Sequence, residues 1–545
     1  MFFVIGMLVI ALSVDAQTVE RPESYNYQRG LEALQEEKHQ KALEYFNKDL
    51  TENPSNGYSY SWIAHLRLVS GEYGKALTAV ELAIKNLPKN DSEFVIFGYL
   101  IRAKIYLCLE DTTKALADYT TAIKIKPDGL KLYERRAQIY YELQQYELAD
   151  ADYLVMTKLD PGDVMGYMGL GRNANAKSQW HNAIKQFDYV TKLAKDYSSG
   201  YAFRAEAFIA LEKWNEATDD IISAISLDWD RKAISLASHL NGSALTMFIS
   251  KLKVQSLKSP NNPRWPYMIG SMYEQNGQYA EAVNSYKEAN SKNISPAICE
   301  RIANCCSELG QYHQALSYID LALNMDSTDL SFNVLKADIL YDLGDVNGAI
   351  SQWTKVLDVQ PDDAYGYQRR GWLKELAGDP DGAMEDLSMS IVLDPNDSYA
   401  YVVRGRLYLK QGKKDLAEAD FNKVIEIEDK PEKYCVLHYA YLGLGQNKRA
   451  IEIMDRVLAK SNDLAGDYYD AACLYARMGM KEKALFYLGK SMEFGNRDFA
   501  HMARDYDMAP IRGTNEYKRL IEHYQYDNQG ALINVEGKAK PMRTE

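Results

Sequence analysis

The sequence lacks a hydrophobic run long enough to cross a membrane. Residues 2–14 form an uncharged, almost wholly apolar run of 13, whereas a spanning helix needs about 20. It also lacks a long basic stripe: 63 Lys and Arg stand against 76 Asp and Glu, a net charge of −13, which argues against a nucleic-acid partner. Proline is scarce, 15 in 545 residues, and 46 % of the residues are hydrophobic. The chain therefore has a globular composition, neither disordered nor fibrous.

Motifs that carry catalytic or metal chemistry are missing. The six cysteines include no CxxC pair, the eight histidines show no ligand spacing, and no GxxxxGK[ST], HExxH or GxSxG occurs, so we expect no metal, no cofactor and no enzyme. The pair Gly169 and Gly171 falls inside a helical pattern, which favours close helix packing over a phosphate loop. Most of the cysteines are interpreted as small buried residues, although an exported protein could use them in disulfides. They are Cys108, Cys299, Cys305, Cys306, Cys435 and Cys473.

The apolar run at the N-terminus has the length of a signal-peptide core. Val14 and Ala16 place small residues at −3 and −1 before Gln17, so residues 1–16 are predicted to be a signal peptide that is removed on export. No Lys or Arg precedes the run, and a buried N-terminal helix or strand is the alternative. On the first interpretation the mature chain has no integral membrane segment and is exported.

A repeat of about 34 residues dominates the chain. It is marked by an alanine column: Ala42, Ala76, Ala115, Ala149, Ala183, Ala217, Ala282, Ala315, Ala349, Ala383, Ala417, Ala450 and Ala484. Four residues later every position is large and apolar or aromatic, from Phe46 to Leu488, and twelve residues earlier every position except His438 is Gly or Ala. Small residues let two helices approach closely and the large one fills the gap to the next unit, so each unit is a helical hairpin that must stack on its neighbours.

These columns resemble the tetratricopeptide repeat (TPR), most clearly in 130–161 and 364–395. The resemblance implies an all-α, right-handed α-solenoid of 13 to 14 hairpins in two sub-arrays. We expect a signal peptide at 1–16, an N-terminal array of six units at 23–229, a degenerate hairpin and proline-rich hinge at 230–262, and an array of seven units at 263–498. A capping loop and helix at 499–525 and a mobile tail at 526–545 follow. The insertion around 90–95 is expected to be a longer loop.

In the TPR family the first helix of each unit lines a concave groove, with its second, fifth, ninth and twelfth residues facing inward. Arginines and aromatics of the units at 364–429, including Arg370 and Arg404, form a candidate patch for anions or acidic peptides. The alternative is that such arginines pair with nearby acids. The carboxylate clamp of TPR co-chaperones is absent. The predicted partner-binding residues are Arg172, Asn175, Tyr267, Asn304, Tyr365, Gln368, Arg369, Trp372, Tyr399 and Arg406. The alternative interpretation is that these are ordinary solvated and inter-repeat residues.

The predicted function is a non-catalytic protein–protein interaction scaffold that binds protein or peptide segments in the concave groove. An exported TPR architecture with an Ala-Gln junction is typical of the periplasm or cell envelope of Gram-negative bacteria, or of an extracellular protein. Two alternatives remain open. One is a carrier or sensor for a small ligand or glycan inside the superhelix; the other is an intracellular adaptor, should residues 1–16 stay attached.

Overall fold

The structure is a computed structural model that describes residues 21–428, 436–461, 463–496 and 498–525. Within these ranges the chain forms helices and turns and no strand, so the all-α prediction is confirmed. The predicted signal peptide, the predicted tail and Cys435 lie outside the described residues. The chain forms two compact units, one ending at Leu240 and one beginning at Asn241.

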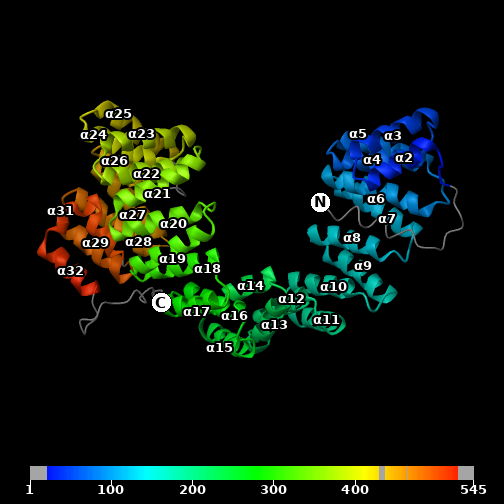
Figure 1. Cartoon of the computed structure of the whole chain (residues 1–545), viewed down its shortest axis with the longest axis horizontal. Helices are drawn as coiled ribbons and strands as arrows, with labels where there is room; N and C mark the ends of the chain where they lie inside the picture. The colour runs from blue at the N-terminus through cyan, green and yellow to red at the C-terminus, as the bar shows by residue number, and fades with distance from the viewer. Residues whose placement is uncertain (1–20, 429–435, 462, 497, 526–545) are drawn as a thin grey trace. The chain divides into compact units, whose positions relative to one another are not determined.

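Unit 1 is a row of helical hairpins followed by one short helix (Figure 1). Its helices are α2 (Tyr25–Gln35), α3 (His39–Glu52), α4 (Gly57–Val69), α5 (Tyr73–Asn86), α6 (Ser92–Cys108), α7 (Thr112–Ile125), α8 (Leu130–Glu142), α9 (Tyr146–Leu159), α10 (Val164–Ala176), α11 (Trp180–Leu193), α12 (Ser198–Ala210), α13 (Trp214–Leu227) and α14 (Arg231–Ser238).

Unit 2 begins with a longer helix, continues as hairpins and ends in short elements. Its helices are α15 (Gly242–Lys258), α16 (Arg264–Gln275), α17 (Tyr279–Lys292), α18 (Pro296–Glu308), α19 (Tyr312–Met325), α20 (Ser331–Leu343), α21 (Val346–Val359), α22 (Ala364–Leu376), α23 (Pro380–Leu393), α24 (Ser398–Lys410), α25 (Lys414–Ile427), α26 (Leu437–Gly443), α27 (Asn447–Lys460), α28 (Leu464–Arg477), α29 (Lys481–Glu493), α30 (Phe499–Arg504), η1 (Tyr506–Met508), α31 (Ala509–Arg512) and α32 (Asn515–Gln525).

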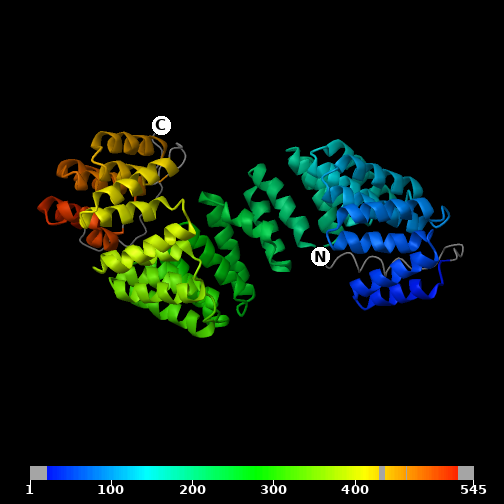
Figure 2. The same ribbon diagram turned by 90° about the horizontal axis from the view of Figure 1, so that it is seen from above.

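Hairpins stack in chain order within each unit. The second helix of each hairpin packs against the first helix of the next hairpin. Neighbouring first helices, such as α8, α10 and α12, also contact one another. Seen from above, the helices of unit 1 lie roughly side by side along the array (Figure 2). The side formed by the first helices is called the first-helix face of each unit below.

The repeat columns are the core of this stack. All thirteen alanines of the marker column are fully buried, and the large residues four positions later, from Phe46 through Trp353 to Leu488, are buried as well. Gly171 shows why the upstream column is small, because a Cβ placed there would lie 2.5 Å from the ring of Phe187. Close packing at Gly171 is thereby confirmed, and α10 contains both glycines of the pair.

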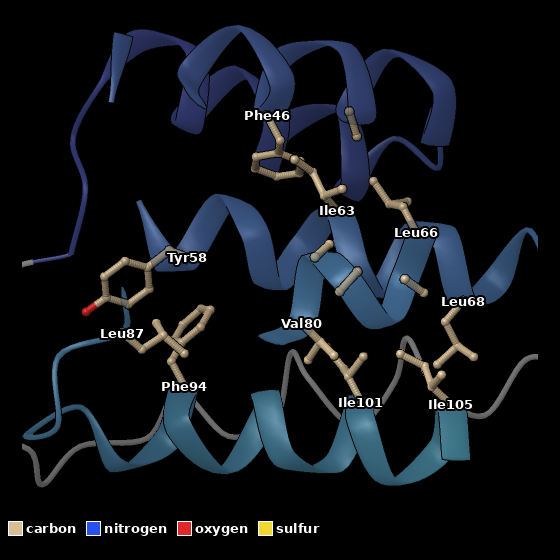
Figure 3. Close-up of a cluster of buried hydrophobic side chains, with 14 of the residues drawn as sticks. Phe46, Tyr58, Ile63, Leu66, Leu68, Val80, Leu87, Phe94, Ile101 and Ile105 are labelled. Carbon is tan, nitrogen blue, oxygen red and sulfur yellow. The ribbon is translucent and has the colours of Figure 1, made fainter. Parts of the chain in front are cut away.

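Aromatic and aliphatic side chains of three successive hairpins meet in a continuous core at the start of unit 1. Figure 3 shows Phe46 from α3, Ile63 and Leu66 from α4, and Ile101 from α6 lying between the helices. Burying side chains of this size stabilises the folded chain by roughly 1.5–3 kcal/mol each. Since one hairpin has no second surface of its own, this stabilisation depends on stacking.

A ladder of ion pairs runs along the array and joins the two helices within several hairpins. Arg136 binds Asp152, sixteen residues later on its own second helix, at 2.6 and 2.8 Å, and donates to Thr120 on the preceding second helix. The same spacing pairs Arg102 with Asp118, Arg204 with Asp220, Arg370 with Asp386 and Arg404 with Asp420. These arginines are structural, so the interpretation that they pair with nearby acids is confirmed.

The turn inside each hairpin differs between the units. One residue in each turn has a positive φ, the left-handed region that L side chains avoid. In unit 2 glycine occupies it in every described hairpin turn, for example Gly310 with φ of 69°. In unit 1 only Gly71 does so, and the other five turns use Glu37, Glu110, Gln144, Ser178 and Glu212.

Two local predictions need correction. The insertion at 90–95 was expected to lengthen a loop, but α6 begins at Ser92 and absorbs it as an extra helical turn. Asp91 accepts a hydrogen bond from the Phe94 amide at 3.2 Å and binds Arg21, which fixes this earlier start. The loop expected after 499 instead contains α30, η1 and α31 before the capping helix α32.

The predicted cysteine environment is largely as expected. Cys299, Cys305, Cys306 and Cys473 are buried, Cys108 is exposed, and all five are free thiols. Burial raises the pKa of the Cys306 thiol, which keeps it in the inert protonated form.

Candidate interaction faces

On the first-helix face of unit 1, Arg172 lies between two aromatic rings from neighbouring first helices. Its guanidinium carbon is 4.8 Å from the ring centre of Tyr141 on α8 and 5.6 Å from that of Phe203 on α12. Its Nε atom is buried without a hydrogen-bond partner, and no carboxylate within the described ranges lies at ion-pair distance. Arg172 is thus a positioned cation without a counter-ion.

The surroundings of Arg172 are already hydrogen-bonded to one another. Asn175 donates to the Phe203 carbonyl at 3.0 Å and to Glu206 at 2.8 Å. Lys232 on α14 binds Glu206 at 2.9 Å and lies 4.5 Å from the Phe203 ring centre. Asn175 therefore holds α10 against α12, and Glu206 is occupied by Asn175 and Lys232.

In unit 2 the structure brings Arg369, Trp372 and Arg406 into one neighbourhood, but it neutralises the arginines. Arg369 lies 4.9 Å from the Trp372 ring centre and binds Asp338 at 3.1 Å. Arg406 binds Glu375 at 2.5 Å. With Arg370 and Arg404 in the ladder, every arginine of the predicted anion patch has a carboxylate partner.

Among the other predicted residues of this region, Tyr399 belongs to the same neighbourhood, whereas Gln368 and Tyr365 have partners elsewhere. Gln368 donates to Asp397 at 2.8 Å, and the half-exposed Tyr399 lies near Arg406 and Arg369. Tyr365 packs edge-on against Trp353 and lines a cavity of about 420 Å³ beside the turn at Thr328 and Asp329.

Two predicted residues lie near the start of unit 2. Tyr267 packs against Tyr286, with ring centres 5.5 Å apart, and Asn304 lies 3.4 Å from Glu274. Glu274 also accepts a hydrogen bond from Tyr286 at 2.6 Å. This group links α16, α17 and α18 and is separate from the neighbourhood of Trp372.

The first-helix face of unit 2 is contacted by the chain's own C-terminal residues 498–512, called the returning segment below. Its α30 reaches α20: His501 Nδ1 is 2.8 Å from the Tyr341 hydroxyl, and Arg504 donates to the Asp342 carbonyl at 2.9 Å. The Arg504 guanidinium also lies 4.9 Å from the Tyr341 ring centre. These contacts join positions about 160 residues apart in the sequence.

The middle of the returning segment meets α24 and α28. Tyr469 donates to Asp505 at 2.8 Å, and Lys410 lies 4.2 Å from the Tyr506 ring centre. Asp507 lies 3.6 Å from Arg477 and 3.8 Å from Arg406. Although burial raises the pKa of Asp505, hydrogen bonds, first that with His501, lower it to about 2.

Sequence reasoning missed two parts of these faces. Tyr141 is the twelfth residue of its unit and therefore faces inward by the same position rule that identified Arg172, but it was not among the predicted residues. The returning segment carries no repeat period, and the only available signal was the alternation of acid and aromatic in Asp505, Tyr506 and Asp507.

Across the described ranges, no helix combines the length and the apolarity that crossing a bilayer requires. The same residues contain no cluster of three or more His, Cys, Asp or Glu placed to hold a metal ion.

Comparison with known proteins identifies the repeat. One tetratricopeptide repeat model matches residues 98–128, 130–163, 267–291, 296–329 and 398–431, and a second tetratricopeptide repeat model matches 334–398. No curated protein matches the chain.

Solved structures with matching chains include several repeat proteins. A tetratricopeptide repeat protein from Parabacteroides merdae matches at 17 % identity and a TM-score of 0.33, covering 51 % of this chain and 97 % of its own. The C-terminal part of a TPR repeat-containing protein from Cytophaga hutchinsonii matches at 16 % and 0.36, covering 49 % and 95 %. MamA from Desulfovibrio magneticus matches at 20 % and 0.29, covering 31 % and 95 %. The repeat-model matches and the regular hairpins show that the chain is a multi-repeat tetratricopeptide repeat protein, built as a protein-interaction scaffold.

Proposed function

We propose that the chain is a non-catalytic scaffold of the periplasm or cell envelope that binds a protein or peptide segment on the first-helix face of unit 1. Arg172 is the anchor and takes a carboxylate of the bound segment. The observation that carries this proposal is the stack of Tyr141, Arg172 and Phe203, which presents a guanidinium without a counter-ion.

The Arg172 side chain is already held in a fixed position before a partner binds. The two rings restrict the Arg172 side chain, so less conformational entropy is lost when a partner binds. A carboxylate on a guanidinium forms strong charge-assisted hydrogen bonds, and arginines beside aromatics are frequent hot spots of protein interfaces. Arg136 and Arg204, on the two flanking first helices, are already committed to Asp152 and Asp220.

The proposal is tested by capture on immobilised mature chain, residues 17–545, from the native envelope fraction. Arg172→Ala is expected to weaken binding of the specific partner by about 2 kcal/mol, roughly 30-fold. Arg172→Lys should recover only part of the affinity, because an ammonium keeps the charge but not the planar stack. Arg135→Ala, which removes an exposed cation of α8, is the matched control.

Equal capture by the wild-type, Arg172→Ala and Arg135→Ala baits would refute Arg172 as the anchor. Export is tested separately by the intact mass of the protein from its native source. Loss of residues 1–16 supports a periplasmic or envelope location, and their retention refutes it.

A further inference from the structure

The returning segment does more than cap the last hairpin. A terminal repeat needs its open face covered, and Met502, Met508 and Ile511 do this by burying their side chains with Tyr469 and Leu488. Figure 1 shows α31 and α32 beside α28 and α29. Capping does not require contacts with α20 and α24, which belong to hairpins well before the last one.

The contacts beyond the cap resemble those of a bound peptide. Arg504 donates a hydrogen bond to a main-chain carbonyl of α20. The ring of Tyr506 lies over two cations of α24, with its centre 4.2 Å from Lys410 and 5.8 Å from Arg406. Tyr506 is about half exposed, so its side chain is held by the cations beneath it and not by burial in a core.

The two carboxylates beside Tyr506 have separate partners on the face. Asp505 accepts hydrogen bonds from Tyr469 and, at 3.4 Å, from Cys473, both on α28. Asp507 is buried between Arg477 and Arg406, and its Oδ1 atom has no hydrogen bond among the described residues. The face therefore contacts an aromatic residue that lies between two carboxylates.

We propose that residues 498–512 are a detachable internal ligand of the first-helix face of unit 2, and that a partner segment with a carboxylate–aromatic–carboxylate sequence binds this face in their place. The face offers Arg406 and Lys410, two cations that share the single carboxylate of Glu375, together with Arg477 and with the Tyr341 ring and hydroxyl. The partner acquires them when the returning segment leaves. This proposal concerns unit 2 and is independent of Arg172.

The test uses the full chain and a fluorescein-labelled peptide with the sequence of residues 498–512. In the wild type the tethered segment competes at an effective concentration on the order of millimolar, so the free peptide is largely excluded. The double variant Arg504→Ala, Tyr506→Ala loosens the contacts to α20 and α24 and keeps the capping residues. We expect it to bind the peptide at least tenfold more tightly than the wild type does.

The controls separate a specific exchange from general loosening. Lys518→Ala removes an exposed cation of the capping helix α32 and should leave peptide binding at the wild-type level. A peptide with Asp505→Asn and Asp507→Asn should lose most of its affinity for the double variant. Tyr341→Phe, which removes only the hydroxyl that contacts His501, provides a milder variant should the double variant fold poorly, with a smaller gain in peptide affinity.

Three outcomes would overturn the proposal. Equal affinity for the wild type and both loosened variants would place the peptide elsewhere. Absence of binding to both loosened variants would make the segment a structural cap only. Unchanged affinity of the Asn peptide would remove the role of the two carboxylates.

Discussion

The two units use the same hairpin and differ in what lies on their first-helix faces. In unit 1 the guanidinium of Arg172 lies between two rings with no carboxylate partner among the described residues. In unit 2 Arg369 and Arg406 are paired, and the returning segment contacts α20, α24 and α28. On the proposals made above, unit 1 presents a cation to an external partner, whereas the face of unit 2 is covered by a segment of the same chain.

The difference extends to the backbone. Unit 2 has glycine at the left-handed position of each described hairpin turn, whereas five turns of unit 1 hold a residue with a side chain there. Such residues cost about 1–2 kcal/mol each in that conformation. Unit 1 consequently carries local strain that unit 2 avoids.

The largest effect is expected from removing Asp505. Asp505→Ala leaves the Tyr469 hydroxyl and His501 without their carboxylate, and we expect the free energy of opening of the returning segment to fall by about 3 kcal/mol. Hydrogen exchange of residues 498–512 in the full chain measures this. Glu452→Ala, an exposed carboxylate on α27, is the control and should change nothing. Equal protection in both variants would show that Asp505 does not hold the segment.

A pair of glycine substitutions compares packing in the two units. The Cβ of Gly171→Ala would lie 2.5 Å from the Phe187 ring, whereas that of Gly371→Ala would lie 3.0 Å from Leu387 Cγ and 3.3 Å from the Ala383 carbonyl oxygen. We expect Gly171→Ala to destabilise unit 1 by about 2 kcal/mol. Gly371→Ala should destabilise unit 2 by less, about 1 kcal/mol, because its contacts are longer and the better helix propensity of Ala offsets part of their cost. Urea unfolding measures both, and equal effects would contradict the different packing.

The hairpins were predictable from the sequence because their contacts repeat. Ala349 and Trp353 are buried for the same reason as their counterparts in every other unit, so each column supports the next. The returning segment was not predictable, since the contact between Tyr341 and His501 occurs once and joins residues about 160 apart. The candidate Arg406 was chosen by its position in the repeat, which gives no information about Glu375 or Asp507.

The returning segment should loosen as pH rises from 6 to 8. Burial lowers the pKa of His501, but its pairing with Asp505 raises it more, so the net pKa lies above the ordinary value. The ion pair between His501 and Asp505 is therefore fully present below pH 6.5. It is lost as pH rises through the raised pKa of His501. Burial and nearby acids, Asp498 foremost, raise the pKa of Asp342 to about 7, and burial with Asp467 does the same for Asp470. Both carboxyls therefore stay protonated in the folded state up to about pH 7, and their cost in stability grows as pH rises towards 7 and is constant above it.

The groups around His501 all belong to this balance. They are Asp498, Arg504 and Asp505 on the segment, Tyr341 and Asp342 on α20, and Tyr469 and Asp470 on α28. We expect the opening constant of residues 498–512 to rise roughly tenfold between pH 6 and 8, measured by hydrogen exchange corrected for its intrinsic pH dependence. Unit 1 should respond in the opposite sense, because burial lowers the pKa of His65 to about 4, so that unit 1 gains stability as pH rises from about 4 to 6.5 and none above that. A response of one sign in both units would contradict this prediction.

The smallest effect is expected at the turns. Gln144→Gly should stabilise unit 1 by about 0.5 kcal/mol, because relief of the left-handed strain exceeds the entropy cost of glycine. Gly310→Ala should destabilise unit 2 by about 1 kcal/mol for the converse reason. Thermal unfolding of the two variants measures this, and a shift of the same sign in both would show that the turns do not distinguish the units.

If the returning segment is detachable, it must open without the hairpin beneath it. Native-state hydrogen exchange of the unmodified full chain can show this by comparing residues 498–512 with α28 and α29. We expect the returning segment to be protected but to open at a lower free energy, while α28 and α29 stay closed. Exchange of all three with one common free energy would contradict it, and so would the absence of any protection at 498–512.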